Sequence, residues 1–119
     1  INRKNFGITF EPANLMACGS DFNKNALNQL LPHTENFYFQ NIILDKKGKH
    51  VFPTIHNGDV RVKYVSLDNS NGINVFSFLD FLREKKYNKW FTVHQPLLED
   101  QTVENAIENA SKLFLEYKF

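Results

Sequence analysis

Three short polar clusters accompany three apolar runs of the sequence, and they contain residue types suited to proton transfer and hydrogen bonding. In chain order they are Glu11 and Asn14, Gln40 and Asn41, and His94 and Gln95. A carboxylate and an imidazole can each act as an acid or a base near neutral pH, whereas amides can only donate and accept hydrogen bonds. Glu11 and His94 are therefore the candidate catalytic residues, and the amides are candidate ligand-binding residues.

The apolar runs that precede these clusters predict β-strands. Residues 6–10 are β-branched and aromatic, and the run stops at Pro12, which cannot donate to a strand ladder. Residues 36–44 form a second extended run that carries polar residues in its middle and is closed by the turn-forming residues 45–48. Residues 90–93 predict the third strand.

Helical spacing of apolar residues separates the predicted strands. Residues 21–31 place apolar side chains on one stripe before Pro32. Asn74 can cap a second helix, which ends in the charged residues 83–86. Thr102 can cap a third helix, which has the clearest amphipathic pattern in the sequence. The stretch 50–71 is loop-like, although the alternating residues 60–65 could form an extra edge strand.

The resulting order of strand and helix, repeated three times, predicts parallel βα units in an α/β fold. Each strand turns polar near its carboxyl end. Ligand sites of parallel α/β folds gather at that edge, because the strand ends and the loops that follow them converge there. We therefore expect the three polar clusters to meet at one place.

Composition excludes several classes of protein. Of the 119 residues, 42% are hydrophobic, which is typical of a globular chain of at most one domain. The net charge of +1 disfavours binding to nucleic acid or to anionic membranes. The single cysteine, Cys18, excludes an intrachain disulfide framework, and no apolar run is long enough to span a membrane. A cytoplasmic protein is the default expectation.

Several short motifs, in this order and spacing, resemble the sugar phosphate isomerase/epimerase family with a xylose-isomerase-like TIM barrel. Residues 6–15 read FGITFEPANL and are similar to the family's sixth strand, a hydrophobic run followed by Asp-Pro-x-Asn-Leu. Residues 38–41 read YFQN, where the seventh strand commonly reads His-Leu-Lys-Asp. Residues 72–75, GINV, and residues 87–94, YNKWFTVH, resemble Gly-x-Ile-Asp and the approach to the eighth strand.

This resemblance implies that residues 1–119 are a single domain or a domain fragment, the last three βα units of a TIM (β/α)8 barrel. A closed barrel takes about 200 to 400 residues, so three units would leave two open strand edges. We expect either the missing N-terminal part of the barrel or a second copy, in a homo-oligomer, to complete the sheet. A genuine small domain with an open three-stranded sheet is the alternative.

The implied activity is that of a sugar isomerase or epimerase, acting by proton transfer next to a carbohydrate carbonyl. The ligand would be a small sugar or sugar phosphate, bound by Tyr38 and His56 together with the four amides. His56 enters because it lies in the loop after the second predicted strand, where family members often carry a Gly-x-Gly segment near the site. No nucleic acid or membrane partner is expected.

The resemblance also raises the question of a metal cofactor. Family members often bind a divalent metal through carboxylates and a histidine, and the metal polarises the sugar carbonyl. At the corresponding positions this chain has Glu11, Tyr38 and His94, and neutral tyrosine is a poor ligand. A Mn, Mg, Co or Zn ion held by Glu11 and His94 is the resulting expectation, with a fourth ligand on a strand that the chain lacks.

Two other functional interpretations remain open from the sequence. One is a non-catalytic carbohydrate-binding relative that kept the polar cluster and lost the chemistry. The other is a small α/β interaction domain without an active site, in which Glu11 simply ends a strand and His94 is a structural histidine.

Overall fold

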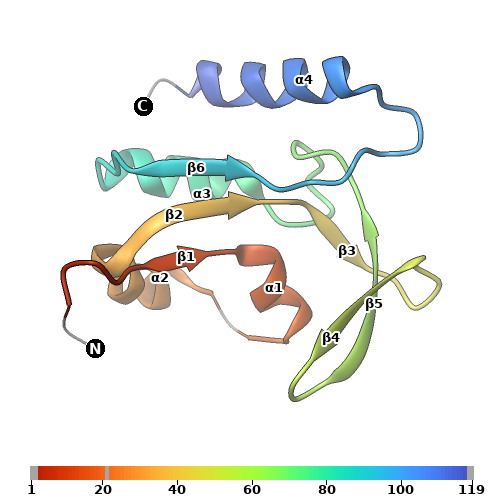
Figure 1. The fold of residues 1–119 in the computed structure, drawn as a ribbon, viewed down its shortest axis with the longest axis horizontal. Helices are drawn as coiled ribbons and strands as arrows, with labels where there is room; N and C mark the ends of the chain where they lie inside the picture. The colour runs from red at the N-terminus through yellow and green to blue at the C-terminus, as the bar shows by residue number, and fades with distance from the viewer. Residues whose placement is uncertain (1–2, 21, 118–119) are drawn as a thin grey trace.

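The computed structural model describes residues 3–20 and 22–117 and has a mixed α/β architecture with two three-stranded sheets (Figure 1). Its elements in chain order are β1 (Ile8–Phe10), α1 (Pro12–Ala17), α2 (Lys24–Leu30), a 3-10 turn η1 (Leu31–His33), β2 (Thr34–Phe39), β3 (Ile42–Leu44), β4 (His50–Thr54), β5 (Gly58–Tyr64), α3 (Val75–Glu84), β6 (Trp90–Val93) and α4 (Val103–Glu116).

The first sheet has the strand order β1-β2-β6, and both pairs of strands are parallel. The three strands are those that the apolar runs predict, so the expectation of a parallel α/β sheet is confirmed. Phe10 pairs with Phe37, and Phe39 pairs with Val93. This register brings the carboxyl ends of all three strands to one edge, immediately before Glu11, Gln40 and His94.

Alternation along the strands directs one face of this sheet toward the helices and the core. The ring of Phe37 lies 5.2 Å from that of Phe10 and 5.1 Å from that of Tyr87, between centroids. Phe78 of α3 contacts Phe10, and Phe114 of α4 contacts Phe39. Burial of these aromatic side chains, together with Leu79 and Leu82 of α3 and Leu113 of α4, holds both helices against the sheet.

The opposite face of the parallel sheet carries half-buried polar side chains and an exposed tryptophan. Asn36 and Thr92 exchange side-chain hydrogen bonds across β2 and β6 at 3.0 and 3.2 Å. Trp90, on β6 beside Asn36, has 76% of its surface exposed. In a closed barrel the corresponding face lines the interior, where side chains from successive strands pack in layers.

The second sheet corrects two sequence-based predictions. The single strand expected over residues 36–44 is in fact two strands, β2 and β3. The chain leaves the parallel sheet at Gln40 and Asn41 and then joins the antiparallel sheet as β3. Most of the predicted loop 50–71 is the hairpin β4–β5, of which only the segment 60–65 was anticipated as a strand. That segment was expected at an edge, but β5 is the central strand of the order β3-β5-β4, because β3 and β4 pair with it on either side.

The predicted helices form, with one addition. Asn74 and Thr102 cap α3 and α4 by accepting hydrogen bonds from backbone N–H groups in the first turn. α2 is shorter than the predicted helix 21–31 and begins after its cap, Asn23; Asp21 lies outside the described residues. The additional helix is α1, which starts at Pro12, since the fixed φ of proline suits the first helical position.

None of the helices in the described part of the chain combines the length and the apolar character needed to cross a lipid bilayer.

Candidate active site at the carboxyl edge of the parallel sheet

Glu11 is the centre of the candidate site. It follows β1 directly and its side chain is only 13% exposed. Asn14, one turn along α1, donates its amide hydrogen to Oε2 of Glu11 at 2.6 Å, and the Nε2 group of Gln40 donates to Oε1. Both carboxylate oxygens therefore have an amide partner, and the head group is held in one orientation.

His94 approaches the same carboxylate from the other edge strand. Its Nδ1 atom lies 3.6 Å from Oε1 of Glu11, and its side chain is 64% exposed. The backbone N–H of His94 donates to the carbonyl oxygen of Phe39 at 2.9 Å, which extends the β2–β6 ladder by one step and fixes the residue. The ring of Tyr38 lies 5.4 Å from the imidazole ring. The structure thus brings together Glu11, Asn14, Tyr38, Gln40 and His94.

Tyr64, at the end of β5, belongs to the surroundings of Glu11 and was not identified from the sequence. Burial raises the pKa of its phenol, and the negative charge of Glu11 raises that pKa further. The ring of His50 packs edge-on against Tyr64 at 4.8 Å. The alternation of residues 60–65 was the available signal for Tyr64, but only the antiparallel pairing with β3 decides that the charge of Glu11 reaches its phenol.

Asn41 and Gln95 are placed differently from the other predicted binding residues. Asn41 is fully buried; its Nδ2 group donates to the carbonyl oxygens of Ser66 and Asn69 at 3.0 and 2.9 Å, and its Oδ1 atom accepts from the N–H of Ile73 at 2.7 Å. Gln95 accepts from the N–H of Asn41 at 2.9 Å. These side chains bind the backbone and hold the loop after β5 against the site.

Gly72 is part of the same arrangement. A Cβ atom at this position would lie 2.2 Å from Oδ1 of Asn41, so only glycine permits the approach.

His56 lies in the turn between β4 and β5 and is exposed. The neighbouring Asn57 donates its side-chain amide to the carbonyl oxygen of Cys18 at 2.8 Å, which attaches this turn to the end of α1. No contact between His56 and Glu11 or His94 is found within residues 3–20 and 22–117. The structure therefore does not bring His56 together with the other predicted site residues, and its role in ligand binding stays a prediction.

The donors present do not complete a metal site within the described residues. Catalytic metal sites usually have three protein ligands. Over residues 3–20 and 22–117 no group of three His, Cys, Asp or Glu side chains is close enough to hold an ion. Glu11 and His94 supply two donors, and both oxygens of Glu11 already accept hydrogen bonds from amides. We therefore assign no step of the chemistry to a metal.

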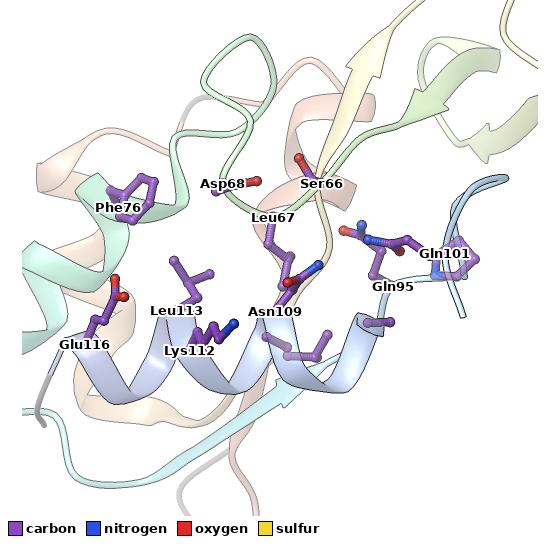
Figure 2. A pocket seen from close by; sticks show the side chains of 14 residues that line it. Ser66, Leu67, Asp68, Phe76, Gln95, Gln101, Asn109, Lys112, Leu113 and Glu116 are labelled. Carbon is purple, nitrogen blue, oxygen red and sulfur yellow. The ribbon is translucent and has the colours of Figure 1, made fainter. Parts of the chain in front are cut away.

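A separate groove of about 410 Å³ runs beside α4, between that helix, the loop after β5 and the end of β6. Figure 2 shows Leu67 and Leu113 directed into it, with Asn109 beside Leu67 and Gln95 close to Gln101. Glu11 and His94 are not among the residues that line it. The groove is thus distinct from the candidate active site.

Comparison with known proteins identifies the fold. The chain resembles the crystal structure of a xylose isomerase domain protein from Planctomyces limnophilus, with a TM-score of 0.60 and 21% sequence identity. The match covers 97% of this chain and 38% of that chain. No protein-family model and no curated protein matches the sequence. At this level of identity the likeness establishes a xylose isomerase-like fold.

Proposed function

We propose that this chain forms three βα units of a xylose isomerase-like TIM barrel and that it acts on a small sugar by moving a proton next to the carbonyl group. The observation that carries the proposal is the pairing of Glu11 with His94 at the carboxyl edge of the parallel sheet. In parallel α/β barrels that edge is where catalytic residues lie. The fold likeness supports the same conclusion.

The reaction needs one base and one acid within reach of a carbonyl group and of the hydroxyl-bearing carbon beside it, and Glu11 and His94 lie side by side, 3.6 Å apart. Glu11 is the base: its carboxylate takes the C–H proton, and the electron pair of that bond moves into an enediol. His94 is the acid that gives a proton to the carbonyl oxygen, and its exposure leaves it accessible to a ligand. Glu11 then gives the proton to the former carbonyl carbon, while the now neutral His94 takes the proton of the neighbouring hydroxyl group as that oxygen becomes the new carbonyl, which completes an isomerisation.

The neighbouring side chains have positioning roles in this scheme. Asn14 and Gln40 hold the carboxylate of Glu11, so that its orientation is set before the ligand binds. Tyr38, beside the imidazole of His94, offers a hydroxyl group and an aromatic face to a sugar ring.

Hydrogen exchange tests the proposal. The protein is incubated with aldoses and ketoses in D₂O, and deuterium at the carbon next to the carbonyl is followed by NMR. We expect Glu11→Gln to lower the exchange rate by about 10²- to 10⁴-fold, the usual contribution of a general base. The matched control is Glu35→Gln, at the opposite end of the sheet, where Glu35 pairs with Lys89 at 2.7 Å. Equal rates in the two variants would contradict the role of Glu11.

One observation favours a second candidate, a carbohydrate-binding protein without turnover. Both oxygens of Glu11 accept amide hydrogen bonds, as in a polar network that presents fixed acceptors to sugar hydroxyls. This candidate predicts that a sugar raises the thermal stability of the protein while no deuterium enters the sugar.

A further inference from the structure

We propose that Gln95 is a positioning residue for His94. Its side chain closes a ring of hydrogen bonds with the main chain of Asn41 and Val65, and this ring sets where the imidazole lies relative to Glu11. The inference rests on the proposed function for the role of His94, whereas the ring is a feature of the structure alone. The sequence predicts that Gln95 binds the ligand, and its contacts assign it this different role.

The ring consists of three hydrogen bonds that join the chain just beyond β2, β5 and β6. The N–H of Asn41 donates to Oε1 of Gln95 at 2.9 Å, and the Nε2 group of Gln95 donates to the carbonyl oxygen of Val65 at 2.8 Å. The N–H of Val65 donates to the carbonyl oxygen of Asn41 at 3.0 Å, which closes the ring. The ring therefore ties the parallel sheet to the antiparallel sheet where the chain passes from one to the other.

Within this ring, the side chain of Gln95 replaces the next step of the β2–β6 ladder. In a parallel pair, the N–H and the carbonyl of one residue bind two different residues of the neighbouring strand. The N–H of His94 donates to Phe39 at 2.9 Å, so a regular ladder would continue from the N–H of Asn41 to the carbonyl of His94. The N–H of Asn41 donates to Gln95 instead. His94 is thus held by its own N–H and by the side chain of the residue that follows it.

Two partners of the Glu11 carboxylate directly precede members of the ring. Gln40, which donates to Oε1 of Glu11, comes before Asn41. His94, whose Nδ1 atom lies 3.6 Å from the same oxygen, comes before Gln95. The hydrogen bond between Asn41 and Gln95 therefore fixes the spacing of the two segments that carry these partners. Reacting groups need such a support, since a loosely held group loses the geometry that the reaction requires.

Gln95 acts on the candidate active site through the main chain. Both polar atoms of its side chain bind main-chain groups. The side chain also lines the groove beside α4, where Figure 2 labels it, and that groove is not lined by Glu11 or His94. A positioning role and a ligand-binding role therefore predict different effects when the Gln95 amide is removed.

NMR measures the position of His94 without any ligand. The rings of Tyr38 and His94 lie 5.4 Å apart between centroids, so their protons should give nuclear Overhauser effects. Gln95→Met keeps the length of the side chain and removes both hydrogen bonds, and we expect these effects to be lost. Gln95→Glu keeps the oxygen that accepts the backbone hydrogen bond and should retain them. Gln101→Met is the matched control, because Gln101 lies in the same loop and accepts from the N–H of Leu98 at 3.4 Å.

Hydrogen exchange in D₂O separates positioning from ligand binding. The probe is the aldose or ketose that exchanges fastest with the unaltered protein. Gln95→Met should lower the maximal exchange rate by up to about 10²-fold, the cost of a small displacement of a catalytic group. The sugar concentration that gives half of the maximal rate should stay unchanged, because Gln95 does not contact the ligand. Gln101→Met should exchange at the rate of the unaltered protein.

Three results would overturn the inference: Tyr38–His94 effects that persist in Gln95→Met, their equal loss in Gln95→Glu, or a raised half-saturating sugar concentration at an unchanged maximal rate. If Gln95→Met does not fold, Gln95→Glu decides: retained effects support the role of the accepting oxygen, and lost effects overturn it. Failure of the proposed function is a separate result. Absence of exchange with every sugar in the unaltered protein would refute proton transfer, and the NMR comparison would still decide whether Gln95 positions His94.

Discussion

The Nδ1 atom of His94 lies 3.6 Å from Oε1 of Glu11, although the two residues follow strands on opposite edges of the parallel sheet. β2 separates β1 from β6, and Gln40 at its end bridges the gap by donating a hydrogen bond to Glu11. The contact therefore depends on the parallel register of all three strands. It places an acid and a base side by side where the strands end.

Replacing His94 by alanine should abolish turnover and leave the fold nearly unchanged. The side chain is mostly exposed, and substitutions at such positions usually alter the free energy of unfolding by within about 0.5 kcal/mol. The rate of deuterium exchange should fall by about 10²- to 10⁴-fold. His33→Ala, in the exposed turn before β2, is the control. Unchanged exchange in His94→Ala would remove this residue from the mechanism.

The pKa of Tyr64 should depend on the charge of Glu11. Its phenol pKa is raised by burial and, in addition, by the Glu11 carboxylate. Glu11→Gln removes the second cause, so the pKa should move back toward its usual value of 10.0. Ultraviolet titration of the phenolate measures it, and subtraction of the Tyr64→Phe titration isolates this one of the four tyrosines. An identical pKa in Glu11→Gln would show that Tyr64 lies outside the site.

Substitution of Asn41 should lower the free energy of unfolding more than substitution of most other polar residues. Asn41→Ala leaves the N–H of Ile73 and the carbonyl groups of the loop after β5 without their partner. An unsatisfied buried group costs about 1–3 kcal/mol. Asn41→Asp is nearly isosteric but brings carboxylate oxygens against carbonyl oxygens, so it should destabilise at least as much. Chemical denaturation measures both changes. A larger loss in Asn41→Ala would contradict this account of the Nδ2 donor.

Stability should fall at alkaline pH because of Tyr87. Burial, and next the charge of Glu35, raise the pKa of Tyr87 to about 12 from 10.0. Between pH 10 and 12 the phenol of the unfolded chain has lost its proton, whereas the phenol of the folded chain still holds it. The free energy of unfolding therefore decreases as the pH rises through this range. The contribution, at most about 3 kcal/mol, is complete below pH 10 and lost by about 12.

Denaturation midpoints at successive pH values measure this effect. Tyr87→Phe should have a smaller alkaline decline than the unaltered protein, although it also loses the hydrogen bond to the carbonyl oxygen of Trp90 at 3.2 Å. Parallel declines in the two proteins would assign the effect to other tyrosines.

The part of the fold that follows from local pattern was predictable. Apolar runs define β1, β2 and β6, and the caps Asn74 and Thr102 define the starts of α3 and α4, because strand and cap preferences act over a few neighbouring residues. The polar ends of the strands also predicted that Glu11, Gln40 and His94 would meet. Parallel strands share one carboxyl edge, so this convergence follows from the order of elements.

Only the tertiary structure decided the second sheet and the partners that it brings. The apolar run over residues 36–44 reads as one strand, yet it divides at Asn41, whose amide binds backbone groups of a distant loop. The pairings of β3 and of β4 with β5 place Tyr64 where the charge of Glu11 reaches it, and bring His50 against its ring. Such pairings depend on register and on burial between segments far apart in the chain, and local residue preferences carry no information about either.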